Sequence, residues 1–231
     1  MTGGVTSLVP GDADDASITY RVADRDDLLA IGRIYVRAFP DTLGDLRSPD
    51  LSPQAAADVM SACLAAEADC IVVAQVQGRD GGKIAGYVIA PSNVARVWRT
   101  ALRRGLLLVW LWRTVSGRYR LSARGVLAVL GDKLSFWRAW GLPGVECEAR
   151  ILSIAVDPAW QGRGIGRRLL EMTLGRLRAR RVACVRLEVR PDNEPALRLY
   201  RSVGFRPAGD YRDSRGRWEI MLLQLRATEH G

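Results

Sequence analysis

Apolar residues recur along the chain with two different periods, which predicts both strands and helices. Short β-branched or apolar runs predict strands at 18–22, 70–76, 83–90, 149–156, 184–190, 205–211 and 218–225. Apolar residues at helical spacing predict helices at 26–39, 52–68, 164–180 and 194–203. Mostly antiparallel strands come first and a strand–helix–strand unit follows. We therefore expect an α/β (α+β) fold, with a mixed, mostly antiparallel sheet and helices on both faces.

The length and the two ends of the chain predict one domain. The 231 residues, 48% of them hydrophobic, suffice for one sizeable core at 18–226. Residues 1–17 have neither the basic nor the apolar region of a signal peptide and are expected to be a disordered lead, with a tail at 227–231. The strongly apolar run 105–112 is too short to span a membrane. The expected location is the cytoplasm, with peripheral contact at the inner membrane surface as an option.

The positive charge is concentrated in one segment. The chain carries a net charge of +9, and residues 91–145 alone hold ten basic residues against the single acidic Asp132. The remainder has 24 basic and 24 acidic residues and is neutral. This distribution excludes a uniformly basic nucleic-acid-binding domain, and no nucleic-acid partner is expected.

The cysteines and the single histidine exclude several kinds of site. Cys63, Cys70, Cys147 and Cys184 form no C-x-x-C pair, and the only histidine is His230. A zinc site and a Ser-His or Cys-His nucleophile are therefore not expected, and no metal is assigned. The four cysteines are interpreted as small core residues in a reducing compartment.

A glycine-rich turn after the 149–156 strand carries candidate chemistry. Gly162, Gly164 and Gly166 remove side chains where backbone N–H groups at the start of the 164–180 helix can bind an anion. Arg163, Arg167 and Arg168 add positive charge, so a pyrophosphate is the natural ligand. The spacing matches neither G-x-G-x-x-G nor a P-loop.

Two motifs identify a family resemblance. Gln161-x-x-Gly164-x-Gly166, after a strand that ends in Ile-Ala-Val-Asp-Pro at 154–158, resembles the acetyl-CoA-binding signature of the GCN5-related N-acetyltransferase (GNAT) family. The stretches 187–193 and 196–205 resemble the second half of that signature. The resemblance implies a GNAT fold whose sheet splays between the strands at 151–157 and 184–190. It also implies acetyl-CoA as co-substrate and direct transfer to a primary amine.

The resemblance also implies roles for individual residues. The pantetheine would pair with the backbone of three strand residues, the pyrophosphate would lie on the N–H groups of the turn, and Asn193 would reach the pantetheine. The implied cofactor-binding residues are Ile154, Ala155, Val156, Gln161, Gly162, Arg163, Gly164, Ile165, Gly166, Arg167 and Asn193. Asn193 also fits a helix N-cap, which is compatible with a cofactor contact.

Tyr200 and Glu188 are the candidate catalytic residues. Tyr200 occupies the family's general-acid position, although its helical face would also suit the core. Glu188 lies twelve residues earlier, in a setting that resembles the branch acetylating protein N-termini, and would act as a base through water. Its alternation with apolar residues fits a cross-strand ion pair equally well. Glu146 and Glu148 are the alternative bases.

Residues 91–145 form an insert relative to a plain member of the family. The insert holds five of the seven tryptophans, and apolar stripes predict helices at 94–115 and 122–140. Three interpretations stay open: a helical cap with solvated arginines, a hairpin at 94–140 that contacts an anionic membrane or a protein partner, and a wall of the acceptor site.

The resulting hypothesis is an N-acetyltransferase whose acceptor is a small amine such as a phosphate-bearing amino sugar. One alternative is a protein N-terminal acetyltransferase of the kind that acts on ribosomal proteins. An alternative of another class is a non-catalytic acyl-CoA-binding module with a docking hairpin. Either a monomer or a homodimer is compatible with the sequence.

Overall fold

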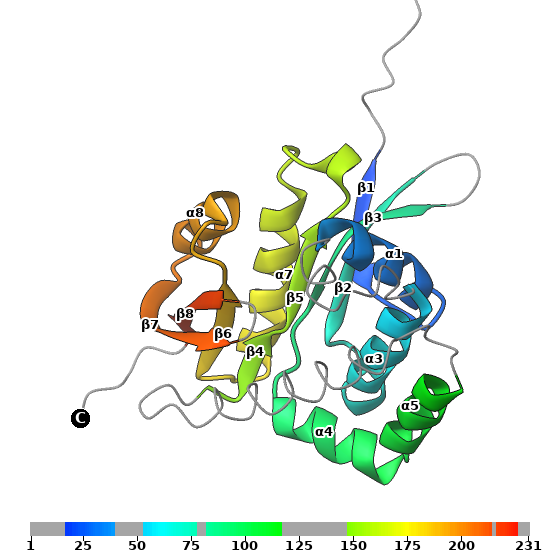
Figure 1. The fold of residues 1–231 in the computed structure, drawn as a ribbon. Helices are drawn as coiled ribbons and strands as arrows, with labels where there is room; N and C mark the ends of the chain where they lie inside the picture. Colours follow the sequence, from blue (N-terminus) through cyan, green and yellow to red (C-terminus); the bar gives the residue numbers. More distant parts are fainter. Residues whose placement is uncertain (1–16, 40–52, 78–81, 117–146, 214–215, 226–231) are drawn as a thin grey trace, which may run out of the picture.

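The computed structural model describes residues 17–39, 53–77, 82–116, 147–213 and 216–225, arranged as two four-stranded sheets side by side (Figure 1). The first sheet has the order β1-β2-β3-β5, with β1 (Ile18–Val22), β2 (Ile71–Val76), β3 (Lys83–Ile89) and β5 (Ser153–Val156). The second has the order β4-β6-β8-β7, with β4 (Ala149–Ile151), β6 (Cys184–Val189), β7 (Arg206–Asp213) and β8 (Gly216–Gln224). The expected lead up to residue 16, the tail with His230, and Glu146 lie outside the described residues.

The predicted strand at 149–156 is two strands that belong to different sheets. β4 pairs in parallel with β6, and β5 pairs antiparallel with β3. Leu152 lies between them and donates its N–H to the carbonyl of Ile89 at 2.8 Å. The apolar pattern runs through this residue without interruption, so the break left no mark in the sequence. The predicted splay is confirmed, because β5 and β6 leave this point in separate sheets.

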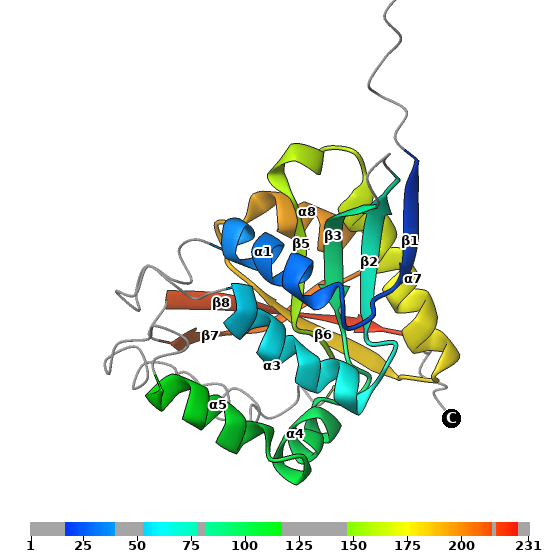
Figure 2. The same cartoon turned by 90° about the vertical axis from the view of Figure 1, so that its right-hand side faces the viewer.

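Helices cover both faces of the first sheet, as predicted. α1 (Leu28–Ala38) and α3 (Pro53–Ala66) pack on one face, while α7 (Ile165–Ala179) packs on the other (Figure 2). Val72 and Val88 belong to the core on the α7 side, and Val73 and Tyr87 belong to the core on the α1 side. Since these strands are buried on both faces, they read as continuous apolar runs.

The predicted helix at 94–115 is interrupted at Gly105. α4 (Val94–Arg103) and α5 (Leu106–Val115) are separate helices, and Gly105 between them has a φ of +64°, which favours glycine. Two members of the predicted apolar stripe are exposed, Leu102 by 62% and Trp112 by 71%. Because the chain changes direction at Gly105, residues that would share one face of a continuous helix lie on two different helices. The predicted second helix at 122–140 lies outside the described residues.

The prediction of four reduced cysteines is wrong for two of them. Cys63 and Cys70 are free and buried, whereas Cys147 and Cys184 form a disulfide with a Cα–Cα distance of 5.4 Å. The cause is the register of the parallel pair β4–β6, in which Ala149 lies beside Val185. Cys147 is two residues before Ala149 and Cys184 is one residue before Val185, so this register brings the two cysteines within reach of a disulfide. Spacing along the chain does not reveal such a neighbour.

The insert and the glycine turn attach at opposite ends of the β4–β5 strand. The N–H of Val94, at the start of α4, donates to the carbonyl of Glu148 at 3.2 Å, and the N–H of Arg150 donates to Pro91 at 3.3 Å. The turn follows Val156 at the far end, and both views place α4 and α5 away from it (Figures 1 and 2).

Candidate active site

The glycine turn links β5 to α7 through a short 3₁₀ helix, η1 (Pro158–Trp160). The carboxylate of Asp157 accepts the N–H of Ala159 at 3.1 Å and so caps η1. Gly162 and Gly164 follow with φ values of +78° and +75°, and a Cβ on either would meet no atom within 4 Å. Backbone conformation rather than space therefore requires these two glycines.

The first turn of α7 supplies free backbone donors. The N–H of Arg168 donates to the carbonyl of Gly164 at 3.1 Å, which is the first hydrogen bond of the helix. The N–H groups of Ile165, Gly166 and Arg167 precede this bond and have no acceptor inside the helix. They lie at the positive end of the helix dipole, so the sequence prediction of an anion-binding turn fits this geometry.

Two arginines of the turn are positioned by neighbouring side chains. The guanidinium of Arg163 lies over the ring of Trp160, 4.9 Å from its centroid. Arg167 donates to the hydroxyl of Ser202 at 2.8 Å, a contact that joins α7 to α8 (Glu194–Ser202). Both arginines belong to the segment that carries the free N–H groups, so the turn has the donors and the charge that a diphosphate requires.

The edge of β5 that faces the splay offers a second row of backbone groups. The N–H of Asp157 donates to the carbonyl of Ala85 on β3 at 2.8 Å. In an antiparallel strand, every second residue directs its backbone N–H and C=O to the same neighbouring strand. Ala155 therefore directs its backbone to β3, while Ile154 and Val156 direct theirs away from it. The side-chain amide of Gln161 donates to the Val156 carbonyl at 3.1 Å.

Asn193 occupies the N-cap of α8, as predicted. Its side chain accepts the N–H of Ala196 at 3.2 Å, and Pro195 stands in the first turn. The cap fixes the start of the helix that carries Tyr200.

Tyr200 is a buried residue of α8. Its ring meets Phe205 edge to face with 5.9 Å between centroids, and 6% of its surface is exposed. Burial raises the pKa of its hydroxyl to about 12, so the group keeps its proton at neutral pH. The core interpretation is thus correct for the ring, and the hydroxyl remains in the protonated form that a general acid needs.

Glu188 lies between two arginines, which is the ion-pair alternative of the sequence prediction. Its Oε2 accepts from Nε and Nη2 of Arg150 on β4 at 2.7 and 2.5 Å, and its Oε1 accepts from Nε of Arg186 at 2.6 Å. All three side chains are less than 10% exposed. They project from the face of the second sheet opposite to Ile151 and Leu187, which pack with α7. The sequence placed Arg186 near Glu188 but did not reveal Arg150.

Tyr211 on β7 completes this cluster and was not predicted. Burial, and then the negative charge of Glu188, raises the pKa of its hydroxyl to about 12. Burial also lowers the pKa of Arg150 against the attraction of Glu188. We call these four residues, Arg150, Arg186, Glu188 and Tyr211, the β-face cluster. Only the register of β6, β8 and β7 brings Tyr211 to it, and sequence separation hides that register.

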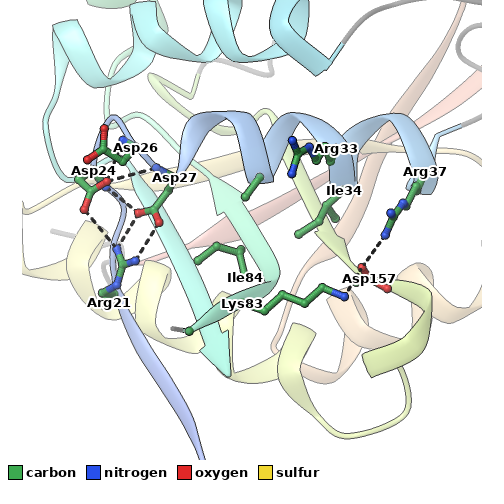
Figure 3. A pocket seen from close by; sticks show the side chains of 12 residues that line it. Arg21, Asp24, Asp26, Asp27, Arg33, Ile34, Arg37, Lys83, Ile84 and Asp157 are labelled. Carbon is green, nitrogen blue, oxygen red and sulfur yellow. Dashed lines mark hydrogen bonds and ion pairs between the residues drawn. The ribbon is translucent and has the colours of Figure 1, made fainter. Parts of the chain in front are cut away.

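A charged hollow of about 430 Å³ lies on the other side of the glycine turn (Figure 3). Arg37 of α1 and Lys83 of β3 both reach the buried carboxylate of Asp157, at 3.2 and 3.9 Å. None of the predicted site residues lines this hollow. Its contacts tie the end of β5 to α1 and so support the turn from behind.

The described residues hold neither a metal-site cluster nor a membrane-spanning helix. No group of three or more His, Cys, Asp or Glu side chains in these residues lies together as a metal site would require. None of the described helices has both the length and the apolar character to cross a membrane.

Comparison with known proteins places these features in a family. The model described as "Acetyltransferase (GNAT) family" matches residues 28–205. N-alpha-acetyltransferase RimI from Mycobacterium tuberculosis is 56% identical over 62 residues, 27% of this chain and 37% of that protein. The [Ribosomal protein bS18]-alanine N-acetyltransferase of Escherichia coli K12 is 42% identical over 82 residues, 34% and 55% of the two chains.

A third relative has a different acceptor in its name. Mycothiol acetyltransferase from Brachybacterium faecium is 37% identical over 114 residues, 48% of this chain and 31% of that protein. The chain thus spans about half or less of the length of these curated relatives.

Solved structures share the fold over nearly the whole chain. The structure of SsHAT aligns with a TM-score of 0.65 and 24% identity, covering 91% of this chain and 100% of that one. Salmonella typhimurium yncA, a structure with acetyl-CoA, aligns with a TM-score of 0.53 and 19% identity, covering 92% and 95%. The prediction of a GNAT fold is confirmed, and the match to a family of acetyltransferases agrees with the predicted acyltransferase activity and acetyl-CoA donor.

Proposed function

Because the chain belongs to the GNAT acetyltransferase family, we propose that it transfers the acetyl group of acetyl-CoA to the α-amino group of a protein N-terminus. The observation that carries this acceptor is the similarity to two enzymes named for N-α-acetylation and for alanine N-acetylation of a ribosomal protein. The alternative from the sequence is therefore preferred to the small phosphate-bearing amine.

The donor would be held mainly by backbone groups. The N–H groups of Ile165, Gly166 and Arg167 and the guanidinium of Arg163 suit the diphosphate of the coenzyme. The N–H of Gln161, which the sequence prediction included, donates to the carbonyl of Pro158 at 3.4 Å instead. Ile154 and Val156 present the edge of β5 on which the pantetheine amides would pair. Ala155 directs its backbone to β3, so it would make no hydrogen bond to the pantetheine and would only hold Ile154 and Val156 in the strand.

The chemistry requires a proton to leave the amine and another to reach the sulfur. The neutral amine attacks the thioester carbonyl, and the N–H of Val156 is the donor suited to the oxyanion that forms. When the C–S bond breaks, the thiolate takes the proton of the Tyr200 hydroxyl, which burial keeps protonated. Tyr200 then recovers a proton from solvent.

Glu188 would receive the amine proton through water. Each carboxylate oxygen has two lone pairs. Arg150 occupies both on Oε2 through its Nε and Nη2, whereas Oε1 accepts from Arg186 Nε and keeps a lone pair for a water. The arginines fix the orientation of the carboxylate, and Arg150 and Arg186 are thus positioning residues. Glu148 is exposed and accepts a hydrogen bond from Asn93 at 3.2 Å, which favours Glu188 over it.

A small-molecule acceptor is the second candidate, favoured by the similarity to mycothiol acetyltransferase. It corresponds to the leading sequence hypothesis of a small amine. Proteins of the third class, which bind acyl-CoA without turnover, would lack a response to any amine.

One assay separates the three candidates. The protein is incubated with isotopically labelled acetyl-CoA and a panel of peptides with free or formylated N-termini, together with glucosamine 6-phosphate as a small-amine probe. Label on the α-amino group of free peptides, absent with formylated ones and with Tyr200→Phe, supports the proposal. Label only on the amino sugar would overturn it in favour of the second candidate, and coenzyme binding without label would favour the third.

A cytoplasmic location accompanies this proposal, because acetyl-CoA and newly made protein N-termini meet there. Disulfides are uncommon in that compartment, so the Cys147–Cys184 bond provides a check. Thiol alkylation of the protein in freshly lysed cells should label both cysteines if the protein is cytoplasmic and reduced.

A further inference from the structure

The insert presents an exposed surface that combines arginines with large apolar side chains. We call the side chains of Arg99, Leu102, Arg103, Leu108 and Trp112 the α4–α5 face. Leu102 is 62% exposed, and Leu108 and Trp112 are each 71% exposed. We propose that the α4–α5 face docks on the surface of an anionic lipid bilayer.

The fold directs these side chains away from the core. On α5, Leu106 and Trp110 pack against the α1–α3 core, and Arg113 pairs with Asp58 of α3. Leu108 and Trp112 are one turn apart on the opposite side of the same helix. The apolar groups are therefore exposed although the helix has a second, anchored apolar side.

On α4 the division is equally sharp. Val97 and Ala101 are buried, while Arg99, Leu102 and Arg103 are exposed. The two helices thus hold their outward side chains on a platform that is itself packed on the protein, and docking requires no new folding.

The charge of the two helices is entirely positive. Residues 94–115 contain five arginines and no aspartate or glutamate. Within the described residues, no carboxylate forms an ion pair with Arg99 or Arg103, although Arg113 pairs with Asp58. Such a surface is complementary to a negatively charged partner.

The mixture of side chains favours lipid over other anionic partners. RNA would neutralise the arginines but would leave Leu102, Leu108 and Trp112 in water. The headgroup region of an anionic bilayer accepts both, because apolar side chains enter the acyl boundary while arginines stay among the phosphates. The described helices are too short to cross the bilayer, so this contact is peripheral.

Docking would also orient the molecule. Val94 at the start of α4 donates to Glu148, and Arg150 of β4 donates to Pro91 just before α4, so the helix attaches at the β4 end, away from the glycine turn. The turn would then face the aqueous phase that supplies acetyl-CoA, and the β4 end would face the membrane. The docking itself does not depend on the proposed acceptor.

The test is co-sedimentation of the full chain with vesicles of phosphatidylcholine, with or without phosphatidylglycerol, across a salt series and without acetyl-CoA. We expect binding only to the anionic vesicles, weakening as salt rises. The variants R99Q/R103Q and L108S/W112S should each weaken binding about tenfold or more. Because all four side chains are exposed, both variants should keep the circular dichroism spectrum and melting temperature of the parent.

Two matched controls make the result specific. R178Q/R206Q removes the same charge from exposed positions on α7 and β7, and V22S/L29S removes exposed apolar side chains from β1 and α1. Both should bind as the parent does. The proposal would be overturned if the folded protein did not bind anionic vesicles at low salt, or if the control variants lost as much vesicle binding as the test variants. Tighter binding to polyuridylate RNA than to vesicles, or self-association without vesicles that L108S/W112S abolishes, would also overturn it by assigning the face to another partner.

Discussion

The two ends of segment 149–156, β4 and β5, carry sites of different construction. At the β5 end, backbone N–H groups and two glycines in the left-handed region form the glycine turn. At the β4 end, the side chains of Arg150, Arg186 and Glu188 form a buried charged cluster. A site made of backbone tolerates changes of side chain but not of conformation, whereas a site made of paired charges depends on every member.

The largest expected effect is on the β-face cluster. Glu188→Ala should lower the free energy of unfolding by about 3–5 kcal/mol, because it leaves the guanidinium groups of Arg150 and Arg186 buried without the carboxylate between them. Urea denaturation measures this loss. The control Glu194→Ala removes an exposed ion pair with Arg198 and should change stability by less than about 0.5 kcal/mol. Equal losses in the two variants would contradict the structural role of Glu188.

The next largest effect concerns Tyr200, the proposed catalytic acid. Tyr200→Phe should lower kcat about 100-fold, equivalent to roughly 2.7 kcal/mol in the barrier, while the KM for acetyl-CoA stays within about threefold. The phenyl ring keeps the packing against Phe205, so the melting temperature should change little. Thiol release from acetyl-CoA measures the rate. A kcat within twofold of the parent would restrict Tyr200 to the core.

Alkaline titration tests the environment of the same hydroxyl. Because burial raises the folded-state pKa of Tyr200 to about 12, its contribution to stability is complete below the usual pKa near 10 and is lost as the pH rises towards 12. Between pH 9 and pH 11.5 the parent should lose about 2 kcal/mol more stability than Tyr200→Phe. Urea denaturation at the two pH values gives this difference, and parallel losses would indicate a solvated hydroxyl.

The smallest effect on stability is expected at Gly164, where the backbone conformation, and not a steric contact, requires glycine. Gly164→Ala should cost about 1–2 kcal/mol, because the φ of +75° is unfavourable for alanine although space is free around it. The KM for acetyl-CoA should rise about tenfold as the N–H groups turn away. Gly175→Ala is the matched control, since Gly175 lies inside α7 with no atom within 4 Å of its Cβ position. That change should instead stabilise the protein by about 0.5–1 kcal/mol.

The sequence predicted most of the glycine turn at the β5 end and little of the charged cluster at the β4 end. The glycine spacing predicted the turn at 161–167 because a backbone site leaves its requirement in the residue type itself. Asn193 as a cap and the order of elements were readable for the same local reason. The break at Leu152, the disulfide and the presence of Arg150 and Tyr211 beside Glu188 depend on strand register. Register depends on which residues of neighbouring strands pair, such as Ala149 with Val185 and Tyr211 with Trp218, and local apolar patterns do not encode it.

The Cys147–Cys184 bond has a consequence for the unfolded chain. The 37-residue separation of the two cysteines encloses β4, β5, the glycine turn and α7 in one covalent loop. Closing a loop of that length removes conformational entropy from the unfolded state, worth about 4 kcal/mol in the chain-entropy description. The part of the chain that carries the glycine turn would thus begin folding with its ends already joined, and reduction would return that conformational freedom to the unfolded ensemble.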